Sequence, residues 1–299
     1  MNYSVPISKT VDKYEIEGVL HFITIQTQIA DFQLVKYLFI EKPTMQLSEI
    51  RAFYPENLHA RGTFLLREYL QCKILEILFQ SKYALKFAFI GGTCLRLLHR
   101  TQRFSEDLDF DNFDLSENEF IEVSTLIKKE LELQGYTVEI KNVFRGAFHC
   151  YVRFPGVLFS EGLSGHKEAK ITINLDTEAQ HFAFEPDRVL FQKFDIFTTI
   201  LSAPIDLLLS QKIAAIAGRK RPKGRDFYDT TFLFARTTPD YRYLSERLGI
   251  SNKEQLKAFL RKECAEFDFD LLAQDVAPFL FYEKDLIRVK LFREFIETL

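Results

Sequence analysis

The sequence lacks the features that mark several classes of protein. Tryptophan is absent, and 12 glycines and 9 prolines among 299 residues are too few for a collagen-like or disordered low-complexity chain. The four cysteines form no C-x-x-C pair, so we expect neither a disulfide framework nor a zinc site, and a reducing cytoplasm is the natural compartment. No uncharged run reaches the roughly 18 residues of a membrane-spanning helix, and no signal peptide pattern opens the chain. The net charge of −3 draws the chain neither to nucleic acid nor to a membrane.

What is present predicts an α+β fold. Hydrophobic residues make up 47% of the chain, enough for a substantial core, and the length suggests about two domains. Helical spacing runs over residues 61–81, and Ser116 with Glu119 predicts a capping box at the start of a later helix. Further patterns predict strands at 86–90, 106–111, 136–143, 147–154 and 170–176, and a short helix at 93–100.

The chain after about Pro186 is expected to be helical, with a helical face near 191–197. This organisation predicts a mixed β-sheet packed with helices on one face, as in nucleotidyltransferases, plus a helical C-terminal region. The expected division is an N-terminal extension at 1–60, a core at 61–186 and a helical domain at 187–299.

The segment that carries chemistry begins where the first of these strands ends. Gly91, Gly92 and Thr93 follow it, and glycines at a helix start let the backbone approach a phosphate closely. Asp107 and Asp109 stand two apart on the next strand, so their side chains share one face. Carboxylate oxygens are ligands that Mg²⁺ selects, usually together with substrate phosphates. The two features together favour metal-assisted phosphoryl or nucleotidyl transfer.

These residues resemble a known family. The G-G-T at 91–93 with R-F-S-E-D-L-D-F at 103–110 is similar to the pattern of polymerase-β-like nucleotidyltransferases, and more narrowly to the AbiEii toxin family. Downstream, Lys212 and Arg219 on a predicted helix, followed by R-D-F-Y-D at 225–229, resemble that family's lysine helix and R-D-x-x-D segment. The two matches together cover about residues 64–236.

The resemblance implies a role for each matched residue. Asp107 and Asp109 would hold Mg²⁺, and Lys212 and Asp226 would take part in catalysis. The implied nucleotide-binding residues are Gly91, Gly92, Thr93, Arg103, Ser105, Lys212, Arg219, Arg225 and Asp229.

A later strand offers a candidate for a third acidic residue. Many nucleotidyltransferases place another carboxylate on a later strand, where it serves the metal or acts as base. On the strand at 170–176 only Asp176 is acidic on the relevant face, with Asn174 as a weaker ligand. Asp176 is therefore the candidate third metal ligand and catalytic residue; if it lies out of reach, the base is unassigned.

Plainer interpretations compete with the functional ones. Asp107 could open a calcium loop, but Asn112 and Asn118 stand where that loop needs Gly and Glu. The G-G-T could be only a turn, Lys212 could simply reach the surface, and the segment at 225–229 could be a structural ion network.

The leading functional prediction is a Mg²⁺-dependent transfer of a nucleoside monophosphate from a nucleoside triphosphate to an acceptor hydroxyl. By resemblance the acceptor is RNA, with the 3′ end of tRNA favoured, and the protein is a toxin with a cognate antitoxin encoded nearby. Two alternatives stay open: an acceptor hydroxyl on a protein or small molecule, and a catalytically silent nucleotide-binding regulator. An acid-free basic run is compatible with RNA: Lys212, Arg219, Lys220, Arg221, Lys223 and Arg225.

Overall fold

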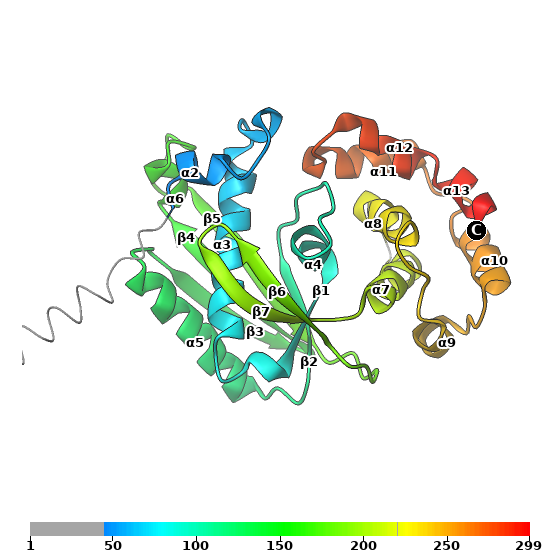
Figure 1. The fold of residues 1–299 in the computed structure, drawn as a ribbon, viewed down its shortest axis with the longest axis horizontal. Coiled ribbons are helices and arrows are strands. Elements are labelled where there is room, and N and C mark those ends of the chain that lie inside the picture. Colours follow the sequence, from blue (N-terminus) through cyan, green and yellow to red (C-terminus); the bar gives the residue numbers. More distant parts are fainter. Residues whose placement is uncertain (1–44, 220) are drawn as a thin grey trace, which may run out of the picture. The chain divides into compact units, whose positions relative to one another are not determined.

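A mixed sheet organises the structure, a computed structural model that describes residues 45–219 and 221–299. Seven strands in this part of the chain lie in the order β3-β4-β5-β2-β1-β7-β6 (Figure 1). Their bounds are β1 Phe87–Ile90, β2 Leu108–Asn112, β3 Glu139–Arg145, β4 Ala147–Pro155, β5 Lys170–Glu178, β6 Asp187–Lys193 and β7 Ile196–Ser202. The β2–β5 and β1–β7 pairs are parallel and the others antiparallel. The five strands predicted from the sequence are confirmed.

Helices precede, interrupt and follow the sheet. The first group comprises α2 Leu47–Arg51, α3 Gly62–Phe79, α4 Gly91–Leu97, α5 Glu117–Leu133 and α6 Val157–Ser160. The second comprises α7 Ile205–Gly218, α8 Gly224–Phe234, α9 Tyr241–Leu248, α10 Lys253–Glu263, α11 Phe269–Val276, α12 Ile287–Lys290 and α13 Phe292–Thr298. The α+β class is confirmed, and residues 1–44 of the expected N-terminal extension lie outside the described residues.

Alternation along β2 separates the core from the polar face of the sheet. Leu108 and Phe110 are buried, and the Phe110 ring lies 6.2 Å from that of Phe79 on α3. Asp109 points the other way, against the start of α4, because successive strand residues face opposite sides. Figure 1 accordingly shows α3 and α5 on one side of the sheet and α4 on the other. The expectation of helices on a single face is therefore wrong.

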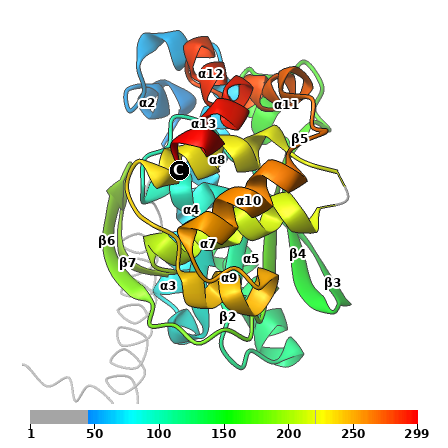
Figure 2. The ribbon, with the colours of Figure 1, turned by 90° about the vertical axis from the view of Figure 1, so that its right-hand side faces the viewer.

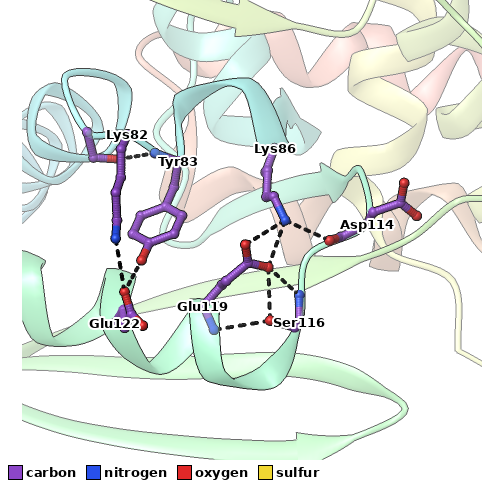
Figure 3. Close-up of polar contacts among 8 residues, drawn as sticks. Lys82, Tyr83, Lys86, Asp114, Ser116, Glu119 and Glu122 are labelled. Atoms are coloured by element: carbon purple, nitrogen blue, oxygen red, sulfur yellow. Dashed lines mark hydrogen bonds and ion pairs between the residues drawn. The ribbon is translucent and has the colours of Figure 1, made fainter.

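The predicted capping box at the start of α5 is confirmed. The Ser116 side chain accepts from the Glu119 backbone N–H, and the Glu119 carboxylate accepts from the Ser116 N–H at 2.9 Å. Lys86, just before β1, donates to Glu119 Oε1 at 2.6 Å (Figure 3). This ion pair connects the entry to β1 with the start of α5.

Residues 187–202 form strands where the sequence suggested helix, and this expectation is wrong. β6 and β7 make a hairpin whose two-residue turn is Phe194 and Asp195, and β7 pairs with β1 inside the sheet (Figure 1). Phe194 adopts a φ of 56°, a conformation usually supplied by Gly or Asn. The hairpin therefore carries no standard turn signal, and the helical region begins at Ile205 rather than at 187.

The helices after Ser202 pack on one another around aromatic side chains, and α7, α8 and α10 face the viewer in Figure 2. Phe227 of α8 is fully buried and contacts the rings of Phe269 and Phe292 edge-on, at 5.3 and 4.9 Å. Gly224 allows α8 to start directly against the Leu272 backbone of α11, where a Cβ would overlap. These contacts hold the acidic residues of α8 in place. In the described part of the chain, no helix combines the length and the apolar character needed to cross a membrane.

Candidate active site

Gly91 closes the turn between β1 and α4 at a position where only glycine fits. Its φ is +76°, and a Cβ there would overlap the carboxylate of Asp109. The structure therefore confirms the sequence prediction that the glycine turn lies beside the acidic strand, since Gly91 and the Asp109 side chain are in direct contact.

The rest of the G-G-T segment packs on the chain that leads into β2. A Cβ at Gly92 would lie 2.7 Å from both the Arg103 guanidinium and the Ser105 hydroxyl. Thr93 is buried and donates its hydroxyl to the Asp107 carbonyl. Gly92 and Thr93 thus position the acidic segment, and their side of the turn is filled by protein.

Three acidic residues lie on or next to two neighbouring strands, with Asp107 immediately before β2. Asp109 is the register partner of Asp176 across the β2–β5 pair, and Asp107 precedes Asp109 by two residues. Nδ1 of His149 on β4 lies 2.8 Å from Asp176 Oδ1. Within residues 45–219 and 221–299, no three His, Cys, Asp or Glu side chains are grouped closely enough to hold a metal ion. The three predicted metal ligands therefore do not form one such group, and binding of a divalent cation by Asp107 with Asp109 stays a prediction.

The electrostatics of this pair fit a cation. Burial raises the pKa of Asp109 to about 6; Lys212 opposes the increase, and Asp107 and Asp176 reinforce it. Burial also raises the pKa of Asp107, with Asp176 adding to the effect and Arg225 opposing it. Two partly buried carboxylates of like charge are stabilised by a divalent cation, and their oxygens are the ligands that Mg²⁺ prefers. Substrate phosphates would complete the coordination.

A buried ion cluster stands beside the acidic pair. Arg103 and Asp229 are fully buried and form two parallel hydrogen bonds, Nε to Oδ1 at 2.7 Å and Nη2 to Oδ2 at 2.6 Å. Lys212 Nζ lies 2.9 Å from Asp229 Oδ2 and 3.2 Å from Asp226 Oδ1. Arg219 Nε lies 3.2 Å from Asp226 Oδ2. The arrangement joins the loop before β2 to α7 and α8, and it neutralises two buried carboxylates with three cations.

A cavity of about 450 Å³ opens where these groups meet. It is lined by Ile90, Gly91, Leu95, Asp109, Glu178, Gln180, Leu208, Gln211, Lys212, Ala214, Ala215, Arg219, Asp226 and Tyr243. The wall combines charged groups with apolar ones, a composition that suits a ligand with a phosphate tail and a flat ring.

Comparison with known proteins identifies the family. Residues 73–294 match the family described as "Nucleotidyl transferase AbiEii toxin, Type IV TA system". The chain belongs to the AbiEii family. It is a nucleotidyltransferase, as the resemblance of its motifs predicted.

One solved structure agrees in fold, and a second shows some similarity. A candidate nucleotidyltransferase from Helicobacter pylori is 19% identical, with a TM-score of 0.50 over 78% of this chain and 94% of that one. JHP933, also from H. pylori, is 19% identical, with a TM-score of 0.49 over 79% and 92%. No curated protein matches the chain significantly.

The AbiEii site residues predicted from the sequence fall into two groups. The cavity is lined by Gly91, Asp109, Lys212, Arg219 and Asp226. The others stand behind or beside its wall: Gly92, Thr93, Arg103, Ser105, Asp107, Asp176, Arg225 and Asp229. Arg225 influences the pKa of both Asp107 and Asp109, so it lies within electrostatic reach of the acidic pair.

Three residues near the site were not singled out by sequence reasoning. His149 meets Asp176 through the register of β4 and β5, which no local pattern reveals. Arg67 of α3 donates to Glu106 at 2.7 Å and lowers the pKa of neighbouring Asp107. Gln211 lines the cavity next to Lys212, and only its position beside the lysine in the sequence could have indicated it.

The raised pKa of Asp109 predicts that Mg²⁺ binding depends on pH. Below about pH 6 the cation must displace a proton, so affinity falls by up to about tenfold per pH unit, whereas it is nearly constant above pH 7. Without Mg²⁺, ionisation between about pH 4 and 6 disfavours the folded state, so the free energy of unfolding decreases as the pH rises through that window. Thermal unfolding at pH 4–8, with and without Mg²⁺, measures both effects.

The matched control for this pH dependence is Asp109→Asn, which fixes position 109 in an uncharged form. We expect this variant to lose the share of the pH dependence that Asp109 contributes, while Asp107 still titrates, and to lose most of the stabilisation by Mg²⁺. Retention of the full Mg²⁺ effect in the variant would contradict the assignment of Asp109 as a ligand.

Proposed function

We propose that the protein transfers a nucleoside monophosphate from a nucleoside triphosphate to a hydroxyl of RNA, with the 3′ end of tRNA as the favoured acceptor. The observation that carries the proposal is the contact between Gly91 and Asp109, which sets this carboxylate against the glycine turn at a cavity that Lys212 also lines. Asp107 and Asp109 would hold Mg²⁺, which supplies charge stabilisation at the reacting phosphates.

The reaction needs one bond formed and one broken. The acceptor oxygen forms a bond to the α-phosphorus, the bond from that phosphorus to the bridging oxygen of the β-phosphate breaks, and pyrophosphate leaves. Lys212 and Arg219 provide positive charge for the phosphates from one wall of the cavity. We assign the proton of the hydroxyl to Asp176, whose carboxylate is oriented by His149.

Arg103 and Asp229 act indirectly in this proposal. Both side chains are fully buried and paired with each other, so they position Lys212 and the acidic segment rather than contact the nucleotide. Thr93 has a similar positioning role through the Asp107 carbonyl.

RNA as acceptor is supported by local charge. Arg219 and Arg221 are exposed between α7 and α8, beside the cavity to which Arg219 contributes. Backbone phosphates of RNA are attracted by such residues without sequence preference. The description of the family as a type IV toxin supports a role as the toxin of a two-gene system with a cognate antitoxin. The four buried, unpaired cysteines suit a reducing cytoplasm.

Label transfer tests the proposed activity directly. Purified protein is incubated with total RNA, Mg²⁺ and each of the four α-³²P-labelled nucleoside triphosphates. We expect label in RNA with at least one of them, lost on adding EDTA or RNase. The same nucleotide labelled at the γ-phosphate is the control and should leave RNA unlabelled, because pyrophosphate departs.

The other outcomes of this assay separate the alternatives. Label on protein or on an RNase-resistant small molecule would replace RNA as the acceptor. Nucleotide binding without any transfer would favour a silent regulator over the proposed enzyme.

A further inference from the structure

The cavity wall formed by α7 contains one polar side chain to which the proposed reaction gives no role. Gln211 immediately precedes Lys212, and its neighbours on the helix face are Leu208, three residues before, and Ala214, three residues after. Those neighbours are apolar, and the small side chain of Ala214 leaves room in the cavity. Gln211 therefore lies on a helix face between two apolar lining residues, whereas Lys212 forms ion pairs with Asp226 and Asp229.

Apolar and aromatic residues from other elements also line the cavity and suit a flat ring. Ile90 and Leu95 contribute from β1 and α4, and Tyr243 contributes from α9. The Tyr243 ring is held by an edge-on contact with Phe182, with ring centroids 5.1 Å apart. A nucleobase is a planar group with apolar faces and polar edges, so it can lie between such walls and present its edge to a polar side chain.

The amide nitrogen of Gln211 is a hydrogen-bond donor without a protein partner. It is buried, and no acceptor lies within hydrogen-bond distance of it in the part of the chain that the structure describes. One other buried polar atom in the cavity wall lacks a hydrogen bond, Asp226 Oδ2, but Arg219 Nε stands 3.2 Å away as its ion-pair partner. A buried donor left unsatisfied is costly, so the position favours a ligand that brings an acceptor.

We propose that Gln211 is a specificity-determining residue that reads the nucleobase of the bound nucleoside triphosphate. This inference rests on the proposed function, because it assumes that the cavity holds the nucleotide with its phosphates toward Lys212 and Arg219. The Gln211 amide donates to a ring nitrogen or carbonyl oxygen on the base edge. A base that presents a donor at that point leaves two hydrogen-bond donors facing each other. Such a polar mismatch discriminates between bases more strongly than a difference in the size of the base does.

Equilibrium binding of the four nucleoside triphosphates with Mg²⁺ tests the proposal without knowledge of the acceptor. We expect the wild-type protein to prefer at least one of ATP, GTP, CTP and UTP by about tenfold or more. Gln211→Met, which keeps the side-chain length but removes the donor, should reduce that ratio by about tenfold. Gln274→Met, at an exposed position of α11, is the matched control and should leave the ratio unchanged.

A second variant changes the sign of the interaction. Gln211→Glu replaces the donor by an acceptor, so we expect the preference to shift toward a base with a donor on its edge. The added negative charge weakens the binding of all four nucleotides alike, because they carry the same phosphates. Its effect therefore cancels in the ratio of their affinities.

The possible failures are distinguishable. An unchanged ranking in both variants, an equal loss for all four nucleotides in Gln211→Met, or a wild-type protein that binds all four equally would overturn base reading by Gln211 while leaving the proposed enzyme intact. A wild-type protein that binds none of them with Mg²⁺ would count against the proposed function itself. Thermal unfolding of each variant shows that it is folded.

Discussion

Asp109→Asn is expected to reduce nucleotidyl transfer by about 10³-fold or more, because it removes a charged oxygen from the carboxylate that contacts the glycine turn. The folded state should tolerate the change, since burial already favours the uncharged form of Asp109, whose pKa is raised to about 6. The measurement is initial-rate label transfer at pH 8 in saturating Mg²⁺, together with thermal unfolding of the variant.

Two further variants make this test specific. Asp107→Asn combined with Asp109→Asn should be little worse than either alone, because residues that act as one unit are not additive. Asp111 is the next residue on the same face of the strand, and its carboxylate accepts a hydrogen bond from the Gln180 backbone N–H at 2.9 Å. Asp111→Asn should therefore keep transfer activity within a few-fold of wild type. Equal losses in the Asp109 and Asp111 variants would show that general negative charge, rather than a metal-binding pair, is what matters.

The features that could be predicted from the sequence are those with local causes. The helix over 61–81, the strands flanking Gly91 and the Ser116 capping box depend on periodicity, turn residues and caps within a few positions of one another. The position of Asp109 belongs to the same class, because alternation with the buried Leu108 and Phe110 sets its side chain on the polar face of β2.

The features that could not be predicted depend on register and on distant packing. The β6–β7 hairpin turns at Phe194, a residue type that gives no turn signal, and the strand pairs with β1 more than 100 residues earlier. The His149–Asp176 contact requires the exact register of β4 against β5. Neither relation is expressed in a short window of sequence.

Lys212 shows how a competing interpretation was decided by the structure. On an apolar helix a lysine often extends to the surface, and the spacing alone left that possibility open. In the structure its ammonium is nearly buried between Asp226 and Asp229, which lie on another helix. An ionic group is brought this far from water only where opposite charges receive it, so Lys212 is part of the ion cluster rather than of a solvated face.

The same cluster gives the second large effect. Asp229→Ala is expected to lower the free energy of unfolding by about 3–5 kcal/mol, because it leaves the guanidinium of Arg103 and the ammonium of Lys212 buried without their shared partner. Urea unfolding of wild type and variant measures the difference. Glu132→Ala, which breaks an exposed pair with Lys128, is the control and should cost no more than about 0.5 kcal/mol.

A conservative variant separates the positioning role of the cluster from its contribution to stability. Arg103→Lys keeps the charge but cannot form two parallel hydrogen bonds with Asp229, so Lys212 and the acidic segment lose their fixed relation. We expect transfer to fall mainly in kcat, with KM for the nucleoside triphosphate nearly unchanged, because Arg103 is buried away from the cavity. If KM rises instead while kcat holds, Arg103 contacts the nucleotide, and the indirect role assigned to the buried pair is wrong.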